Sequence, residues 1–143
     1  MIKNIIIDFK RTIYDPDNNT LLENALDGLK FLKEKEFYVR LVGKGVESEI
    51  ISILQRLDIK SFFDEICISD DKEKFFNKVD NPSSWLVIGD RAQKEILFGG
   101  QLGMNTLWLK NGKFSNEEPL PSQKPPDHVV SAWSEIIEII KKF

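Results

Sequence analysis

The chain has 143 residues, of which 41% are hydrophobic and 30% charged, and this length is enough to bury the core of one globular domain. The net charge of −3 and the scattered lysines exclude the basic surface of a nucleic-acid-binding protein. The N-terminal apolar run, Ile5–Ile7, is too short for a signal peptide or a membrane span. A lone cysteine, Cys67, cannot form an internal disulfide. We therefore expect a single domain over residues 1–143, located in the cytoplasm.

Short apolar runs alternate with amphipathic segments along the chain. In chain order, we expect a strand at 2–7, a helix that starts from the capping box TLLE at 20–23 and runs through Leu32, and a strand at 38–42. A helix at 46–57, a strand at 65–68, a helix at 72–79 and a strand at 85–88 follow. The last elements are a helix at 94–102, a strand at 106–109, a proline-rich surface loop at 111–127, a strand at 128–130 and a helix at 134–142. This alternation predicts an α/β fold, a three-layer sandwich around a mostly parallel central sheet of the Rossmann-like kind.

Acidic residues follow two of the predicted strands. Asp8 comes directly after the first strand, Asp90 follows the strand at 85–88, and Glu95 lies five residues further on. Ligands of such folds bind at the carboxyl ends of the strands. Carboxylates gathered there suit Mg²⁺, which would hold phosphate oxygens beside a carboxylate nucleophile.

The segments around these residues resemble the motifs of the haloacid dehalogenase (HAD) superfamily. IIIDFKRT resembles its first motif, Asp-x-Asp-x-Thr, and VIGDRAQKEI followed by GGQLGMNTLWLKNG resembles its fourth motif with the elements behind it. LKEKEFYVRLVGKG resembles the second-motif strand, SDDKEKFF the third-motif region, and DHVVSAWSEIIEII the closing strand and helix. The resemblance covers essentially the whole chain. The short segment between the first two motifs, which looks like one helix, resembles that of the capless members.

The resemblance implies a role for each matched residue. Asp8 would attack phosphorus, and Thr12 and Lys72 would be the catalytic threonine and lysine, with Lys74 the alternative to Lys72. Gly43 and Lys44, at the second motif, would be substrate contacts, unless Lys44 is a solvated surface charge. Mg²⁺ would be held by Asp8, Asp90 and the backbone carbonyl of Lys10, with Glu95 in place of the motif's last aspartate. The site of a capless member is open to larger substrates or is covered by a partner.

Three positions depart from the family pattern. Lys10 replaces the second aspartate of the first motif, which is the general acid and base of the family. An ammonium can donate a proton but cannot accept one. Gly43 lacks the phosphate-binding hydroxyl of the second motif, and Arg11 replaces the glycine that commonly precedes Thr12. These departures predict a degenerate active site.

Two classes of function remain. The first is a Mg²⁺-dependent phosphohydrolase that acts through an aspartyl-phosphate on Asp8 and is slowed by Lys10 and Gly43. The second is a catalytically inactive HAD-fold module that binds a phosphorylated small molecule or protein. A phospho-receiver domain, which is an α/β fold of similar size, ranks last because it does not explain GDRAQKE. We expect no nucleic-acid or membrane partner, and no feature indicates an oligomeric state. The three tryptophans are expected to be core or interface aromatics.

Overall fold

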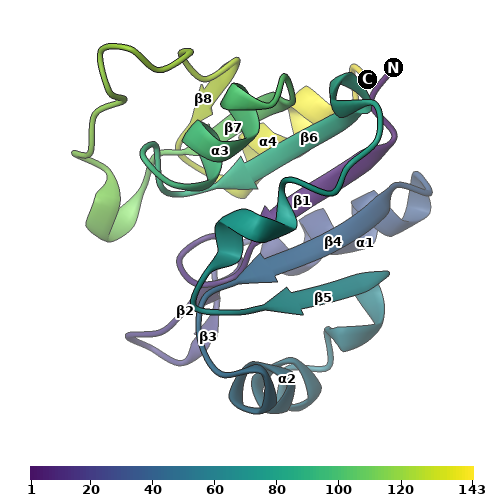
Figure 1. Ribbon diagram of the computed structural model, residues 1–143. Coiled ribbons are helices and arrows are strands. Elements are labelled where there is room, and N and C mark those ends of the chain that lie inside the picture. The colour runs from purple at the N-terminus through teal and green to yellow at the C-terminus, as the bar shows by residue number, and fades with distance from the viewer.

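The computed structural model describes residues 1–143, which build a six-stranded parallel sheet with helices on both faces (Figure 1). The strands are β1 (Asn4–Asp8), β4 (Tyr38–Gly43), β5 (Glu65–Ile68), β6 (Trp85–Gly89), β7 (Asn105–Leu109) and β8 (His128–Val130). They lie in the order β5-β4-β1-β6-β7-β8, and each pair of neighbours is parallel. The predicted α/β fold is confirmed.

The sheet is buried on both faces because its central strands are continuous apolar runs. Ile5 and Ile7 of β1 belong to a larger hydrophobic cluster on one face, whereas Ile6 belongs to a smaller cluster on the other face. Side chains alternate across a strand, so a run of three isoleucines supplies both faces at once.

The helices form the two outer layers. α1 (Ala25–Glu34), α2 (Glu47–Arg56) and α4 (Trp133–Ile140) contribute their buried residues to the larger cluster. α3 (Glu95–Gln101) packs on β6 and β7 in the smaller cluster, on the opposite face from α1 and α4 (Figure 1). Four short 3₁₀ turns complete the chain: η1 (Lys60–Phe62), η2 (Lys72–Phe75), η3 (Pro82–Ser84) and η4 (Gly112–Phe114).

The strand order reverses between β1 and β6. Numbered along the chain, the six sheet strands lie in the order 3-2-1-4-5-6, which is that of a Rossmann-type fold. A phospho-receiver domain has the order 2-1-3-4-5, so that interpretation of the sequence is wrong. Ligands of open parallel sheets bind where the order reverses. Here that place is the carboxyl ends of β1 and β6, where Asp8 and Asp90 lie.

The expected capping box at 20–23 is wrong. Thr20 and Leu21 form β3, which pairs antiparallel with β2 (Tyr14–Asp15), and α1 begins only at Ala25. The turn between these strands decides the outcome. The Asp15 carboxylate accepts hydrogen bonds from the backbone N–H groups of Asp17 and Asn18, which closes a hairpin and leaves Thr20 in a strand.

The expected helix at 72–79 is also wrong, because only the 3₁₀ turn η2 forms there. Phe76 is buried and its ring meets Phe98 of α3 edge-on, with 5.6 Å between the ring centroids. Asn81, before Pro82, adopts a left-handed conformation at φ 52°. A residue before proline disfavours the helical conformation, and the Phe76 side chain packs on Phe98 of α3 instead of continuing a helix.

No cap domain is inserted within residues 1–143. Only the β2–β3 hairpin and α1 separate β1 from β4, and only α2 and η1 separate β4 from β5. None of the helices combines the length and the apolar character that crossing a membrane requires.

Candidate active site

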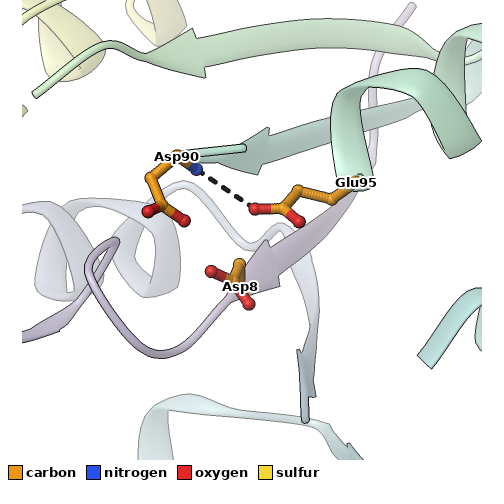
Figure 2. A group of neighbouring side chains, drawn as sticks. All are labelled: Asp8, Asp90 and Glu95. Carbon is orange, nitrogen blue, oxygen red and sulfur yellow. Dashed lines mark hydrogen bonds between the residues drawn. The ribbon is translucent and has the colours of Figure 1, made fainter. Parts of the chain in front are cut away.

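Three carboxylates meet at the edge where β1 and β6 end (Figure 2). Asp8 is the last residue of β1, Asp90 follows β6, and Glu95 is the first residue of α3. One oxygen from each carboxylate can be chosen so that all three lie within 4.8 Å of one another. All three side chains are buried, at 6%, 2% and 1% exposure respectively. The pairing of β1 with β6 therefore brings together residues that are 82 positions apart or more.

Glu95 folds back over the end of β6. Its Oε1 accepts a hydrogen bond from the backbone N–H of Asp90 at 3.2 Å (Figure 2). The same oxygen accepts a hydrogen bond from the backbone N–H of Arg91, also at 3.2 Å. A Cβ atom on Gly89 would lie 2.1 Å from Cγ of Glu95, so this close approach requires glycine. Gly89 thus allows Glu95 to brace the loop that carries Asp90.

A lysine with a side chain that is only 14% exposed contacts two of the carboxylates. Nζ of Lys72 lies 3.1 Å from Oδ1 of Asp8 and 3.0 Å from Oε2 of Glu95. The hydroxyl of Thr12 is 3.3 Å from Oδ2 of Asp8 and 3.5 Å from Oδ1 of Asp90, and it can donate its one proton to either. Both oxygens of Asp8 have a donor when Thr12 donates to Asp8. Lys74, the alternative to Lys72, is exposed and places its ammonium over the Phe75 ring instead.

Burial and mutual repulsion disturb the protonation of this cluster. Burial, followed by the charges of Asp8 and Glu95, raises the pKa of Asp90 well above its usual range. Burial and the charge of Asp8 raise the pKa of Glu95, against the opposing effect of Lys72. Burial disfavours the charge of Lys72, but the carboxylates of Asp8 and Glu95 outweigh it and raise the pKa of Lys72. The cluster is thus short of positive charge.

Lys10 does not join the carboxylates. Its side chain is exposed, and its ammonium lies over the turn after β4, 4.0 Å from the position that a Cβ on Gly45 would take. The sequence left the direction of this side chain open. The Lys10 ammonium is not among the ion pairs of the structure, whereas Lys72 makes two.

The other two departures from the family pattern affect the backbone more than the cluster. Arg11 adopts the left-handed conformation that favours glycine, at φ 64°, and its side chain pairs with Asp17 at 3.1 Å. A Cβ on Gly43 would lie 3.1 Å from Cδ1 of Ile68, the flexible end of a side chain. A serine at position 43 would therefore need only a small shift of Ile68.

A cavity of about 250 Å³ opens beside Lys72. Seven of its eight lining residues are charged, and the lining consists of Lys44, Asp70, Asp71, Lys72, Glu73, Arg91, Lys94 and Phe98. Lys44 is exposed and lies in this lining, whereas Gly43 is buried at the end of β4. The cavity is polar, and Lys72 lies both in its lining and in contact with Asp8 and Glu95.

The loop at 111–127 contributes residues that the sequence analysis missed. Glu117 accepts two hydrogen bonds from the Arg91 guanidinium, at 2.8 and 3.0 Å, and one from the backbone N–H of Gln93 at 2.9 Å. The buried side chain of Gln123 donates to the carbonyl of Ala92 at 2.7 Å. The prolines correctly indicate a loop, but no local signal shows that it folds back onto the residues after Asp90.

The cluster fits a divalent cation. Oδ2 of Asp90 is buried and has no hydrogen-bond partner. When all groups are ionised, three carboxylates face one ammonium, which leaves two negative charges unbalanced. Carboxylate oxygens are the ligands that Mg²⁺ prefers. A site with an orphaned carboxylate oxygen and this charge deficit has the donor set that a Mg²⁺ ion needs.

A protein-family model described as HAD-hydrolase-like matches residues 42–136. The matched segment begins at the end of β4 and reaches into α4. It includes Lys72, Asp90 and Glu95, and it leaves Asp8 and Lys10 outside.

Two curated proteins, both named glyceraldehyde 3-phosphate phosphatase, are similar in sequence. The protein of Pyrococcus furiosus is 25% identical over 122 residues, which cover 78% of this chain and 50% of the relative. The protein of Methanopyrus kandleri is 26% identical over 130 residues, which cover 83% of this chain and 56% of the relative. The chain spans about half the length of the curated relatives it matches.

Solved structures share the fold over nearly the whole chain. L-2-haloacid dehalogenase from Xanthobacter autotrophicus superposes with a TM-score of 0.77 at 11% identity, over 99% of both chains. A haloacid dehalogenase-like family protein from Streptococcus pneumoniae superposes with a TM-score of 0.76 at 13% identity, over 97% of this chain and 98% of that one. At these identities the likeness concerns the fold alone.

Proposed function

Because the chain belongs to the HAD superfamily, we propose that it is a Mg²⁺-dependent phosphohydrolase that uses Asp8 as its nucleophile and turns over slowly. The observation that carries this proposal is the buried cluster of Asp8, Asp90 and Glu95 at the carboxyl ends of β1 and β6. Such a cluster costs folding free energy unless a cation balances it. Its retention in a buried position therefore favours a role in binding.

Each residue of the cluster has a part in the proposed reaction. Asp8 and Asp90, with the backbone carbonyl of Lys10, would hold Mg²⁺, and Glu95 is the third carboxylate within reach. When bound, Mg²⁺ neutralises phosphate oxygens and orients the phosphoryl group. Lys72 and Thr12 each contact one oxygen of Asp8 and so orient the carboxylate for attack on phosphorus.

Lys10 is expected to slow the second half of the reaction more than the first. In the first half, an oxygen of Asp8 forms a bond to phosphorus while the bond from phosphorus to the leaving oxygen breaks, and an ammonium can protonate that oxygen. In the second half, the oxygen of a water molecule forms a bond to phosphorus while the bond from phosphorus to Asp8 breaks, and the water must lose a proton to a base. An ammonium is no base, and missing general base catalysis costs about 10²–10⁴-fold in rate.

The proposed substrate is a small phosphorylated compound rich in polar groups. The cavity beside Lys72 has only one apolar lining residue, Phe98, which offers little surface for an aromatic leaving group. The names of the two curated relatives make glyceraldehyde 3-phosphate the first compound to test. With its single half-buried cysteine, Cys67, the protein is proposed to work in the reducing cytoplasm.

The first test is hydrolysis of a generic aryl phosphate with and without Mg²⁺, because its good leaving group needs little protonation even where the cavity binds the ring weakly. We expect slow, Mg²⁺-dependent release of phosphate that Asp8→Asn abolishes. Asp17→Asn is the matched control, because Asp17 lies in the exposed hairpin turn and pairs only with Arg11. Equal rates for the wild type and Asp8→Asn would show that Asp8 is not the nucleophile.

A second candidate is a binding module for a phosphorylated small molecule or protein. The observations that favour it are the position of the Lys10 ammonium outside the carboxylate cluster and the missing hydroxyl at Gly43. Incubation with acetyl phosphate and Mg²⁺ separates the two candidates. A slow enzyme should show one added phosphoryl group by intact-mass spectrometry, absent in Asp8→Asn. If neither an adduct nor turnover appears, the binding module takes first place.

A further inference from the structure

Two buried tryptophans donate hydrogen bonds to the loops that carry the candidate metal ligands. Nε1 of Trp108, on β7, donates to the backbone carbonyl of Asp90 at 2.9 Å. Nε1 of Trp133, the first residue of α4, donates to the backbone carbonyl of Thr12 at 2.7 Å, across 121 positions of the sequence. Their side chains belong to opposite hydrophobic clusters, so the two indoles approach the site from opposite faces of the sheet.

Both acceptors lie within the machinery of the site. The carbonyl of Asp90 belongs to a candidate metal ligand, and Thr12 carries the hydroxyl that contacts Asp8 and Asp90. No backbone N–H donates to either carbonyl. A buried carbonyl without a donor costs free energy, so each indole satisfies a group that has no other partner.

Backbone hydrogen bonds close the turn that holds Thr12 at its base. The carbonyl of Phe9 accepts from the N–H groups of Thr12, Ile13 and Tyr14, at 3.3, 2.9 and 3.1 Å, and the N–H of Arg11 donates to Tyr14 at 2.6 Å. None of these bonds involves the carbonyl of Thr12. On the other side of the turn, the indole N–H of Trp133 holds the carbonyl of Thr12. The ring of Trp133 has room because it packs on Gly28 of α1, where a Cβ would lie 2.3 Å from the ring. The docking of α4 on α1 therefore places the indole against the turn.

We propose that Trp133 and Trp108 are positioning residues, which set the separation of Asp8 and Asp90 by holding the backbone that follows β1 and the backbone that follows β6. Where it concerns metal affinity, this inference rests on the proposed function. Removing a group that orients a metal ligand without contacting the metal typically weakens metal binding by about 10- to 100-fold. We expect each Trp→Phe substitution to fall near the lower end of that range.

The first experiment needs no metal. Hydrogen exchange of the metal-free protein is followed by mass spectrometry for the peptide that covers residues 9–14. Trp133→Phe keeps most of the ring but removes the donor, so the protected N–H groups of that peptide should exchange roughly tenfold faster. Two controls make the comparison specific. Trp85→Phe is the same substitution at a buried tryptophan that makes no side-chain hydrogen bond, and Ile136→Val removes core volume from α4 itself. Unchanged exchange at 9–14, or the same increase in Ile136→Val, would overturn the proposal.

The second experiment measures Mg²⁺ affinity by calorimetry. Trp133→Phe and Trp108→Phe should each bind Mg²⁺ roughly tenfold more weakly than the wild type, and the two controls should match the wild type. Normal affinity in both Trp→Phe variants would refute the control of carboxylate spacing. If the wild type itself binds no Mg²⁺, the proposed metal-dependent function fails, and the exchange experiment alone decides whether the indoles position the loops.

Discussion

Replacing Lys72 with methionine is expected to lower the free energy of unfolding more than the same replacement at any other lysine of the chain. Lys72 is the sole ammonium within ion-pairing distance of Asp8 and Glu95, and its side chain is only 14% exposed. Methionine fills nearly the same space without the charge. Removing one partner from a buried ion pair typically costs about 3–5 kcal/mol. Since whole domains are stable by about 5–15 kcal/mol, this loss is large.

The loss of stability should depend on pH, because carboxylates that have lost their ammonium partner can become neutral by taking up protons. Burial and mutual repulsion already raise the pKa of Asp90 and of Glu95 in the folded protein. An acid whose folded pKa lies above its unfolded value holds a proton that the unfolded chain releases, so stability falls as pH rises between the two values. Without Lys72 both pKa values rise further. The stability deficit of Lys72→Met should therefore be larger at about pH 8 than at about pH 5.

The assay is urea unfolding at both pH values, with and without saturating Mg²⁺. Mg²⁺ binds only the folded cluster, so it should restore more stability to Lys72→Met than it adds to the wild type. Lys74→Met is the matched control, because Lys74 is exposed and contacts the Phe75 ring rather than the carboxylates. Its stability should change by less than about 0.5 kcal/mol. A deficit in Lys72→Met no larger than that of Lys74→Met, or one that does not grow with pH, would refute this electrostatic account of the cluster.

Three further outcomes are expected. Asp90→Asn removes a carboxyl whose folded pKa is raised, so the decline in stability between about pH 5 and pH 8 should flatten in urea unfolding. The double variant Lys10→Asp with Gly43→Ser restores both groups of the family pattern, so it should raise turnover in the aryl phosphate assay by about 10²-fold or more. No gain in turnover by a folded double variant would favour the binding module. Gly28→Ala should lower the free energy of unfolding by about 1–3 kcal/mol, since a Cβ there lies 2.3 Å from the Trp133 ring. Gly100→Ala is the matched control, because Gly100 also lies in a helix and a Cβ there would have no atom nearer than 3.8 Å. Its free energy of unfolding should stay the same or rise, and thermal and urea unfolding of both variants check this.

Much of the fold follows from local patterns in the sequence. The strands at 65–68 and 128–130 have the predicted bounds, and β1, β4, β6 and β7 differ from prediction by two residues or fewer at each end. Continuous apolar runs determine these strands because both faces of a parallel sheet are buried. The same reasoning placed Asp8 and Asp90 at strand ends on one edge of the sheet, since the carboxyl ends of parallel strands share that edge. The pairing of β1 with β6 made these two strand ends neighbours.

The tertiary structure decided what depends on contacts between distant segments. Thr20 joined a hairpin rather than a helix because the Asp15 turn competed with the capping pattern, and both patterns are equally local. Lys72 rather than Lys74 contacts the carboxylates, and this selection depends on how η2 lies against the ends of β1 and β6, which no local pattern encodes.

Contacts between distant segments also determined which side chains surround the site. The exposed position of Lys10 was not readable from its neighbours, because a long side chain takes its direction from the surfaces around it. The hydrogen bond from Trp133 to Thr12 joins groups 121 positions apart. A tryptophan in an apolar helix predicts burial, but the partner of its N–H is determined by how α4 docks on α1. The sequence alone thus determined the strands and the two strand-end aspartates, while the packing of α1, α3 and α4 around them decided which side chains complete the cluster.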